Sequence, residues 1–484
     1  MEKRITLREL QQHVSYESCW VSLYGRVYDV CVSWLGCSLR ANEVKITGFL
    51  DDHPGGSSIL LNVAGKDATK EYDPIHPPSI MDEHLSSCCL GVLGCGTLAS
   101  RDKAPESEPS RSAAGDSVSQ ALNLHEIETL ARQKLPHKAW AYYLSATDDN
   151  LTKMWNNSVY QSILLRPRVF IDCSQCDLST TVLGHQLGLP VYVSPAAMAR
   201  LAHHSGEAGI ANACAKFGAL QIISHNASLD PVDIIRDARE DQVFGWQLYC
   251  LKDVRQSERR IQKINQIKRI KFIVLTLDAP FPGKREVEVR SKMDFSQPNS
   301  PPQVWGTDAS LTWEKTLRWL HKQTDLPVVL KGVQTYEDAI LAARYAPYIR
   351  GIILSNHGGR ALDTASTPIH TLLEIHHHCP EVFTRLDVMI DGGIKRGTDI
   401  VKALALGAKA VGIGRAPLWG LAAGGPVGVE RVLEILSEET ATAMRLLGVS
   451  NVSQLSRQHI NARALELGGF RSAPDTGERN GSRL

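Results

Sequence analysis

The sequence lacks the features that mark membrane, secreted and nucleic-acid-binding proteins. No apolar run approaches the roughly 20 residues that a bilayer-spanning helix needs, and the N-terminal residues lack the apolar stretch of a secretory signal. Neither sign of charge is in excess, because 53 Lys and Arg stand against 52 Asp and Glu. A balanced charge argues against binding to nucleic acid or to an acidic membrane surface. These absences predict a soluble intracellular protein that does not bind a membrane.

Cysteine pairs at the spacing of a zinc site are also missing. The 11 cysteines are scattered, and the one close pair, Cys173 and Cys176, has no second pair to complete a four-ligand site. Intracellular thiols are normally kept reduced. We therefore expect ordinary thiols, with neither a disulfide nor a zinc ion.

The chain divides at a stretch that cannot form a core. Its 484 residues exceed what one ordinary domain holds, and residues 101–119 are rich in Ser, Pro, Ala and charge. The part of the chain after about residue 467 is again polar and rich in Gly. We predict a front module at 1–98, a flexible linker at 99–120, a rear module at 121–466 and a disordered tail at 467–484.

The rear module repeats a short apolar run, a turn and an amphipathic helical stretch. Near-continuous apolar strands that alternate with helices indicate a parallel sheet buried on both faces, and eight units predict an α/β fold, a closed (β/α)8 barrel. A doubly wound sheet is the competing architecture, but no G-x-G-x-x-G opens the first helix. The eight runs are 191–194, 220–224, 244–249, 272–277, 327–330, 351–354, 388–390 and 410–413.

Polar residues follow these runs, at the strand ends where barrels of this kind carry their active sites. They include Tyr249, Asp278, Lys331 and His357. Gly-containing turns follow the seventh and eighth runs, and barrels commonly hold a phosphate there. With Arg415 in the eighth turn, the sequence predicts a phosphorylated cofactor.

At this point the rear module resembles a known family, the FMN-dependent L-2-hydroxy-acid oxidases and dehydrogenases, over about residues 121–460. The strongest match is a six-residue run, and three others follow the family's order. The four runs are Ser355-Asn356-His357-Gly358-Gly359-Arg360, Leu330-Lys331-Gly332-Val333, Asp391-Gly392-Gly393-Ile394-Lys395-Arg396-Gly397 and Tyr142-Tyr143.

The resemblance implies a role for each matching residue. His357 would remove a substrate proton, Asp278 would stabilise its imidazolium form, and Lys331 would stabilise the reduced FMN ring. The other predicted catalytic residues bind substrate: Arg285 and Arg360 its carboxylate, Tyr249 and Tyr142 its hydroxyl and carboxylate. The predicted FMN-binding residues are Ser194, Ala196, Ser224, Gln247, Thr276, Lys331, Ser355, Asp391, Gly392, Gly393, Arg396, Gly414 and Arg415.

The front module carries two histidines that predict a second redox centre. His53 lies in a His-Pro-Gly-Gly run, and His76 follows 23 residues later. Two opposed imidazoles can hold haem iron and fill both axial positions, which leaves electron transfer as the role. The surrounding runs resemble the cytochrome b5 family, which implies haem b (protohaem IX) with His53 and His76 as ligands. No C-x-x-C-H occurs, which excludes a covalent c-type haem.

A cytochrome b5-like module ahead of an FMN barrel resembles the flavocytochrome b2 family. That resemblance implies oxidation of L-lactate, a one-electron acceptor such as cytochrome c, and a homotetramer. Residues 31–46 depart from the family as an insertion, either a surface loop or a misread intron. Asn226 departs too, because a substrate-facing apolar residue is expected there and an amide favours a more polar side chain.

Location and reaction both have alternatives. Ser482-Arg483-Leu484 at the end of the sequence resembles a peroxisomal address, with the mitochondrial intermembrane space or cytosol as alternatives. The front module starts almost at Met1, which predicts no mitochondrial presequence. The rival functions are an oxidase that reduces O2 to hydrogen peroxide, a non-catalytic redox-sensing module, and a non-redox FMN isomerase.

Overall fold

The computed structural model describes residues 3–31, 50, 53, 57–77, 80–81, 85–94, 117–292 and 307–469. The nature of the insertion at 32–46, the linker up to 116 and the tail from 470 lie outside the described residues. Pro54, Gly55 and Gly56 of the His-Pro-Gly-Gly run lie outside them as well. The terminal Ser482-Arg483-Leu484 belongs to that tail, so the peroxisomal location stays a prediction.

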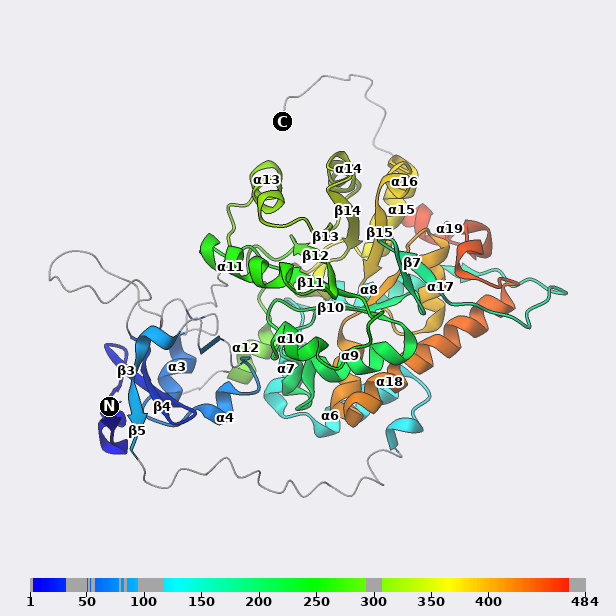
Figure 1. The fold of residues 1–484 in the computed structure, drawn as a ribbon. Helices are drawn as coiled ribbons and strands as arrows, with labels where there is room; N and C mark the ends of the chain where they lie inside the picture. The colour runs from blue at the N-terminus through cyan, green and yellow to red at the C-terminus, as the bar shows by residue number, and fades with distance from the viewer. Residues whose placement is uncertain are drawn as a thin grey trace.

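The rear module is a closed parallel barrel of eight strands (Figure 1). Each of the eight predicted runs overlaps one barrel strand, which confirms the predicted (β/α)8 architecture. The hydrogen-bonded order runs β10-β11-β12-β13-β14-β15-β16-β9, so the last strand pairs with the first. The strands are β9 (Val191–Val193), β10 (Leu220–Ile223), β11 (Phe244–Leu248), β12 (Ile270–Thr276), β13 (Val328–Val333), β14 (Ile349–Leu354), β15 (Asp387–Asp391) and β16 (Val411–Ile413).

Alternation along each strand produces two hydrophobic cores. On β12, Phe272 and Val274 point into the barrel interior, while Ile273 and Leu275 join the larger core under the helices. Both sets are almost fully buried. Because successive side chains of a strand point to opposite faces, a continuous apolar run is what a sheet covered on both sides requires.

Helices form the outer ring of the barrel. They are α9 (Gly206–Phe217), α10 (Pro231–Ile235), α11 (Val254–Asn265), α13 (Trp313–Gln323), α14 (Tyr336–Arg344), α15 (Pro368–His378), α16 (Val382–Arg385), α17 (Gly397–Ala405) and α18 (Arg415–Leu446). Local capping begins several of them, as in α14, where the Thr335 side chain accepts the Asp338 N–H. The backbone of α18 is non-helical at Gly424 and Gly425.

Further helices pack around the ends of the barrel. They are α6 (Leu124–Lys134), α7 (His137–Leu144), α8 (Leu151–Ser158), α12 (Glu286–Lys292) and α19 (Arg463–Gly469). The structure also corrects the predicted linker, because Val118 is fully buried in the barrel core. Its isopropyl group lies against Gly424, where a Cβ would come within 2.8 Å. The rear module therefore begins before residue 121.

The front module is a five-stranded mixed sheet with short helices. The strand order is β1-β5-β4-β3-β2, with β1 parallel to β5 and the other pairs antiparallel. The strands are β1 (Arg4–Ile5), β2 (Val14–Ser15), β3 (Ser18–Leu23), β4 (Arg26–Asp29) and β5 (Cys89–Leu93), and the helices include α1 (Leu7–Leu10), α3 (Ser57–Val63) and α4 (Thr69–Tyr72). No helix among the described residues is long and apolar enough to cross a bilayer.

We predict that Gly245→Ala destabilises the barrel by about 1–3 kcal/mol, because overpacking a filled core forces neighbours to move. A Cβ at Gly245 would come 2.5 Å from the Phe272 ring. The urea-unfolding midpoint of the barrel measures the effect. The double variant Gly245→Ala/Phe272→Leu is the control and should recover part of the loss, since it removes the ring. A midpoint unchanged by Gly245→Ala alone would contradict the prediction.

Candidate active site

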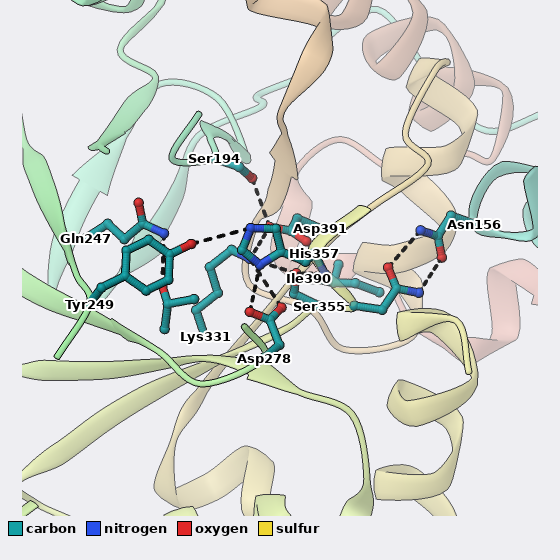
Figure 2. Close-up of polar contacts among 12 residues, drawn as sticks. Asn156, Ser194, Gln247, Tyr249, Asp278, Lys331, Ser355, His357, Ile390 and Asp391 are labelled. Carbon is teal, nitrogen blue, oxygen red and sulfur yellow. Dashed lines mark hydrogen bonds and ion pairs between the residues drawn. The ribbon is translucent and has the colours of Figure 1, made fainter. Parts of the chain in front are cut away.

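A histidine–aspartate pair lies at the carboxyl rim of the barrel (Figure 2). Asp278 follows β12 with its side chain fully buried, and His357 begins the 3-10 turn η5 (His357–Gly359) after β14. The Nδ1 of His357 lies 2.8 Å from Oδ1 of Asp278. That bond orients the ring and directs Nε2 to the hydroxyl of Tyr249, 3.5 Å away. The ring can thus exchange a proton at Nε2 while its Nδ1 stays hydrogen-bonded to the carboxylate of Asp278.

The turn that carries His357 has an unusual backbone. His357, Gly358 and Gly359 have φ values of 58°, 63° and 75°, all in the left-handed region that favours glycine. A Cβ at Gly359 would meet the backbone N of Lys153 on α8 at 2.8 Å. Gly359 therefore lets the turn pack closely against α8, which fixes the position of the histidine.

One buried lysine joins two carboxylates beside this pair. Nζ of Lys331 lies 3.8 Å from Oδ2 of Asp278, 3.6 Å from Oδ2 of Asp391 and 2.8 Å from Oγ of Ser355. Burial alone would lower the pKa of Lys331, but the two carboxylates outweigh it and raise that pKa. The lysine therefore stays charged. Ser194 also donates to Oδ2 of Asp391, at 3.1 Å.

A row of amide and hydroxyl groups lines the next strands of the rim. The side-chain oxygen of Gln247 accepts from Ser224 Oγ at 3.2 Å, and its amide nitrogen donates to Thr276 Oγ1 at 3.0 Å. All three side chains are buried. They come from β11, β12 and the end of β10, as expected for groups that contact one edge of a planar ring. Ala196 lies half-buried in the loop after β9.

Two arginines flank Tyr142 at the mouth of the site. The guanidinium carbons of Arg360 and Arg285 lie 5.2 Å and 5.8 Å from the centre of its ring. Arg285 pairs with buried Glu288 at 3.1 Å, whereas Arg360 donates to the main-chain carbonyls of Tyr142 and Ser145. Burial and the charge of Arg285 lower the pKa of Arg360 to about 10. Two neighbouring cations, Arg285 buried and Arg360 half-buried, favour an anionic ligand between them.

The same two arginines and His357 line one small pocket, together with Phe281. Residues 285 and 360 are far apart in the sequence, yet they meet the histidine within reach of one small molecule. This convergence is the geometry that oxidation of a 2-hydroxy acid requires, since a carboxylate and an adjacent hydroxyl must be held together.

The residues around Arg415 fit the phosphate of the expected FMN. Arg415 is half-buried, and it donates to the carbonyls of Tyr143, Ser145 and Gly358. Burial, with the charge of Arg360, lowers its pKa to about 9. No atom lies within 4 Å of a Cβ built on Gly414, so space is open at the start of α18. A half-buried cation beside a helix N-terminus and a glycine is a suitable phosphate site.

The glycines after β15 fit the same group. Gly392 and Gly393 have φ values of 103° and 80°, and a Cβ on Gly393 would lie 2.0 Å from the carbonyl oxygen of Asn156. Arg396, however, points elsewhere. Its guanidinium pairs with Glu439 at 2.6 Å and its side chain is 52% exposed, which corrects its assignment to the cofactor site. Arg396 precedes α17 and is drawn to Glu439, which also accepts the Gly397 N–H.

Asn156 is a further residue of the site, and no sequence motif predicted it. Its side-chain amide exchanges two hydrogen bonds of 2.8 Å with the amide of Asn356, and both groups are buried (Figure 2). The pair fastens the His357 turn to α8. No local signal marks Asn156, because a single Asn in an amphipathic helix is ordinary and its partner lies 200 residues away.

In the front module, His53 and His76 face one another closely. Their ring centres are 6.0 Å apart with 68° between the planes. Two imidazoles that bind the same metal ion from opposite sides, each at about 2 Å, have ring centres about 6 Å apart. The apolar cluster of this module includes Val30, Leu50 and Leu85, which suits an apolar ring. The described residues therefore fit the expected haem b.

Comparison with known proteins gives two family matches and full-length relatives. The FMN-dependent dehydrogenase family matches residues 131–462, and the cytochrome b5-like haem/steroid binding domain matches residues 45–94. The chain is 35% identical to an L-lactate dehydrogenase (cytochrome) of Wickerhamomyces anomalus, over 95% of this chain and 80% of the relative. A glycolate oxidase of Spinacia oleracea is 36% identical, over 70% of this chain and 95% of its own length.

Solved structures of the same kinds of enzyme are also similar to this chain. A double mutant of flavocytochrome b2 with pyruvate bound has a TM-score of 0.68 and 34% identity, over 76% of this chain and 94% of that one. Mandelate oxidase with a bound difluoro-hydroxy acid has a TM-score of 0.63 and 32% identity, over 70% of this chain and 98% of that one. The relatives with oxidase names cover the barrel, while the cytochrome-linked relative covers both modules.

We predict that Lys331→Met destabilises the barrel by about 3–5 kcal/mol at pH 7.5, because it leaves buried carboxylates without their cation. In the unmodified chain burial raises the pKa of Asp278, but His357 and Lys331 outweigh it and depress that pKa. A depressed pKa adds stability that is present above about pH 4 and is lost only below it, so the unmodified chain keeps this stability at pH 5. In Lys331→Met the buried carboxylates lack their cation and take up protons more readily, which relieves part of the destabilisation. The difference in unfolding free energy between the two chains should therefore narrow toward pH 5.

Urea-unfolding midpoints at pH 7.5 and pH 5 provide the measurement for this prediction. Lys331→Arg keeps the positive charge and is the matched control, which should show the smaller loss. A gap between Lys331→Met and the unmodified chain that widens as the pH falls would contradict the assigned charge network.

Proposed function

We propose, from the premise that the chain belongs to the FMN-dependent dehydrogenase family, that it oxidises an L-2-hydroxy acid, L-lactate in the first place, to the 2-keto acid. The observation that carries the proposal is the convergence of His357, Arg285 and Arg360 on one pocket. The haem module completes it, because relatives that carry both modules are named as cytochrome-linked L-lactate dehydrogenases.

The residues of the pocket divide the work of binding and proton transfer. Arg285 and Arg360 bind the substrate carboxylate, and the hydroxyl of Tyr142 or Tyr249 completes its orientation. His357 accepts a substrate proton at Nε2, the ring nitrogen that faces Tyr249. The buried carboxylate of Asp278 stabilises the imidazolium that results.

The cofactors supply the electron chemistry when bound. Bound FMN would take the two electrons of the substrate, and bound haem b would pass them singly to a one-electron acceptor such as cytochrome c. The residues that would hold FMN are Ser194, Ala196, Ser224, Gln247, Thr276, Lys331, Ser355, Asp391, Gly392, Gly393, Gly414 and Arg415, and His53 and His76 would hold the haem. Lys331 stays charged between its carboxylates and is placed to stabilise an electron-rich ring.

The rival oxidase would pass electrons from the flavin to O2 and leave the haem unused. Anaerobic mixing of the holoenzyme with L-lactate, glycolate or mandelate separates the two. Haem reduction that follows flavin bleaching supports the dehydrogenase, whereas flavin bleaching with an unchanged haem supports the oxidase. The hydroxy acid that bleaches the flavin fastest identifies which substrate side chain the pocket prefers. A homotetramer is part of the proposal and rests on family resemblance.

We predict that His357→Gln slows anaerobic flavin bleaching by about 10²–10⁴-fold, since that is the usual contribution of a general base. Stopped-flow absorbance at saturating L-lactate measures the rate. His321→Gln on α13 is the matched control, because His321 is exposed on the outer ring, and it should bleach at the normal rate. Bleaching of His357→Gln at the unmodified rate would refute the role of this residue.

We also predict that Arg360→Met raises the KM for L-lactate more than Arg396→Met does, because only Arg360 lines the substrate pocket. Loss of one charge-assisted contact costs roughly 2–3 kcal/mol, which is about 30- to 150-fold in kcat/KM. Steady-state assays with ferricyanide, a flavin oxidant, provide the comparison. Equal effects of the two substitutions would show that the carboxylate binds elsewhere.

A further inference from the structure

An ion pair joins the haem module to the flavin barrel. Asp73 ends α4, three residues before His76, and Arg200 lies in the 3-10 turn η4 (Ala199–Leu201) after β9. Nη2 of Arg200 lies 2.6 Å from Oδ2 of Asp73, and Nη1 donates to the main-chain carbonyl of Asp73. Figure 1 shows the α4 end of the small module turned toward the barrel. The contact therefore connects a neighbour of the predicted iron ligand with the loop that begins at Ser194.

Both partners are held by further bonds within their own modules. Oδ1 of Asp73 accepts from the hydroxyl of Tyr24 at 2.7 Å. Burial raises the pKa of Asp73, but the hydrogen bonds from Arg200 and Tyr24 outweigh it and keep that pKa below its usual range. Tyr24 thus orients the carboxylate from within the haem module.

On the barrel side, the main chain of Arg200 is fixed by a buried network. Its N–H donates to Oγ of Ser228 at 3.0 Å, and Ser228 Oγ donates to Oε2 of Glu207 at 2.7 Å. Oε1 of Glu207 accepts the N–H groups of Ala199 and Ser228 at 3.0 Å and 2.9 Å. Glu207 and Ser228 are 2% and 0% exposed. The network joins the loops after β9 and β10, so Arg200 is presented on the rim that also carries the predicted flavin contacts.

The exposure of the pair suits a contact that forms and breaks. The side chains of Arg200 and Asp73 are 18% and 39% exposed. Ion pairs at this exposure stabilise weakly and are screened by salt, unlike the fully buried pairs inside the barrel. A weak, oriented contact lets two modules dock in one geometry and separate again.

We propose that the Asp73–Arg200 ion pair is the docking contact that positions the haem module for electron transfer from the flavin barrel. The inference rests on the proposed function. With both cofactors bound, two electrons would leave the reduced flavin one at a time in each turnover, each would convert a ferric haem to ferrous, and a one-electron acceptor would reoxidise the haem. No bond to Asp73 or Arg200 forms or breaks, so both are positioning residues, and they act by holding the donor and acceptor modules in register.

The test compares charge reversal with charge exchange in the full-length holoenzyme. Arg200→Asp places two carboxylates face to face, and we expect anaerobic haem reduction after mixing with L-lactate to slow about fivefold or more, while flavin bleaching keeps its rate. The double variant Arg200→Asp/Asp73→Arg restores opposite charges and should recover most of the rate. Raising the salt concentration should slow the unmodified chain toward the single variant.

Arg239→Asp is the matched control, because it makes the same charge change at an exposed barrel arginine that pairs with Asp241. It should leave haem reduction unchanged. A readout independent of turnover is hydrogen–deuterium exchange of the segments 69–77 and 197–204, which should rise in Arg200→Asp and not in Arg239→Asp. Asp73→Asn, on the other module, checks that the effect does not come from misfolding of the η4 turn.

The outcomes distinguish failure of the proposed function from failure of the docking contact. Absence of flavin bleaching in the unmodified chain refutes the proposed function, and the exchange measurement still tests the contact. Flavin bleaching with haem reduction in Arg200→Asp that is unchanged or faster overturns the docking contact. Exchange that does not rise in either segment overturns it as well.

Discussion

Two buried carboxylates, Asp278 and Asp391, share one buried ammonium group at the centre of the rim. Charges removed from water are tolerated only when they compensate one another, so the strand ends that carry them must meet in one arrangement. Lys331 lies between them, and the other carboxylate oxygen of Asp278, Oδ1, contacts Nδ1 of His357. The charge network and the catalytic geometry are therefore the same structure, and a change that loosens one loosens the other.

The rest of the barrel exists to hold that rim in place. Strands buried on both faces leave few alternative registers, because a slip of one residue would exchange the interior and exterior cores. Close approaches such as Gly359 against α8 and Gly393 against Asn156 then leave the loops no room for a larger side chain. Arg360 and Arg415 are half-buried cations bonded to main-chain carbonyls, an arrangement that favours anionic ligands.

The haem module meets the barrel under different physical conditions. The Asp73–Arg200 pair is partly exposed, so its stabilisation is small and depends on salt. The network behind Arg200, through Ser228 and Glu207, is buried and is not screened by solvent. The buried network holds the main chain of Arg200 in place, while the ion pair itself is weak. This combination suits a haem module that docks on the barrel and separates from it repeatedly.

The sequence by itself determined the barrel, the order of its strands and most of the rim. Apolar runs at regular spacing define a doubly covered parallel sheet, and the polar residues after each run then fall at one edge. Local patterns can be recognised from the sequence alone, as with the run from Ser355 to Arg360 and the pair His53 and His76. The predicted start of the rear module is too late in the chain. Val118 is flanked by polar residues in the sequence but packs against apolar side chains of the barrel core.

Only the tertiary structure decided which side chains turn toward the site. Arg396 and Arg415 are both arginines beside glycine turns, yet Arg396 pairs with Glu439 at the surface while Arg415 turns inward and donates to three carbonyls. Asn156 and Arg200 act through partners more than 100 residues away, and no local pattern marks either of them. The physical reason is that a side chain's direction depends on the charges and hydrogen-bond groups that packing brings near it, and those come from distant parts of the chain.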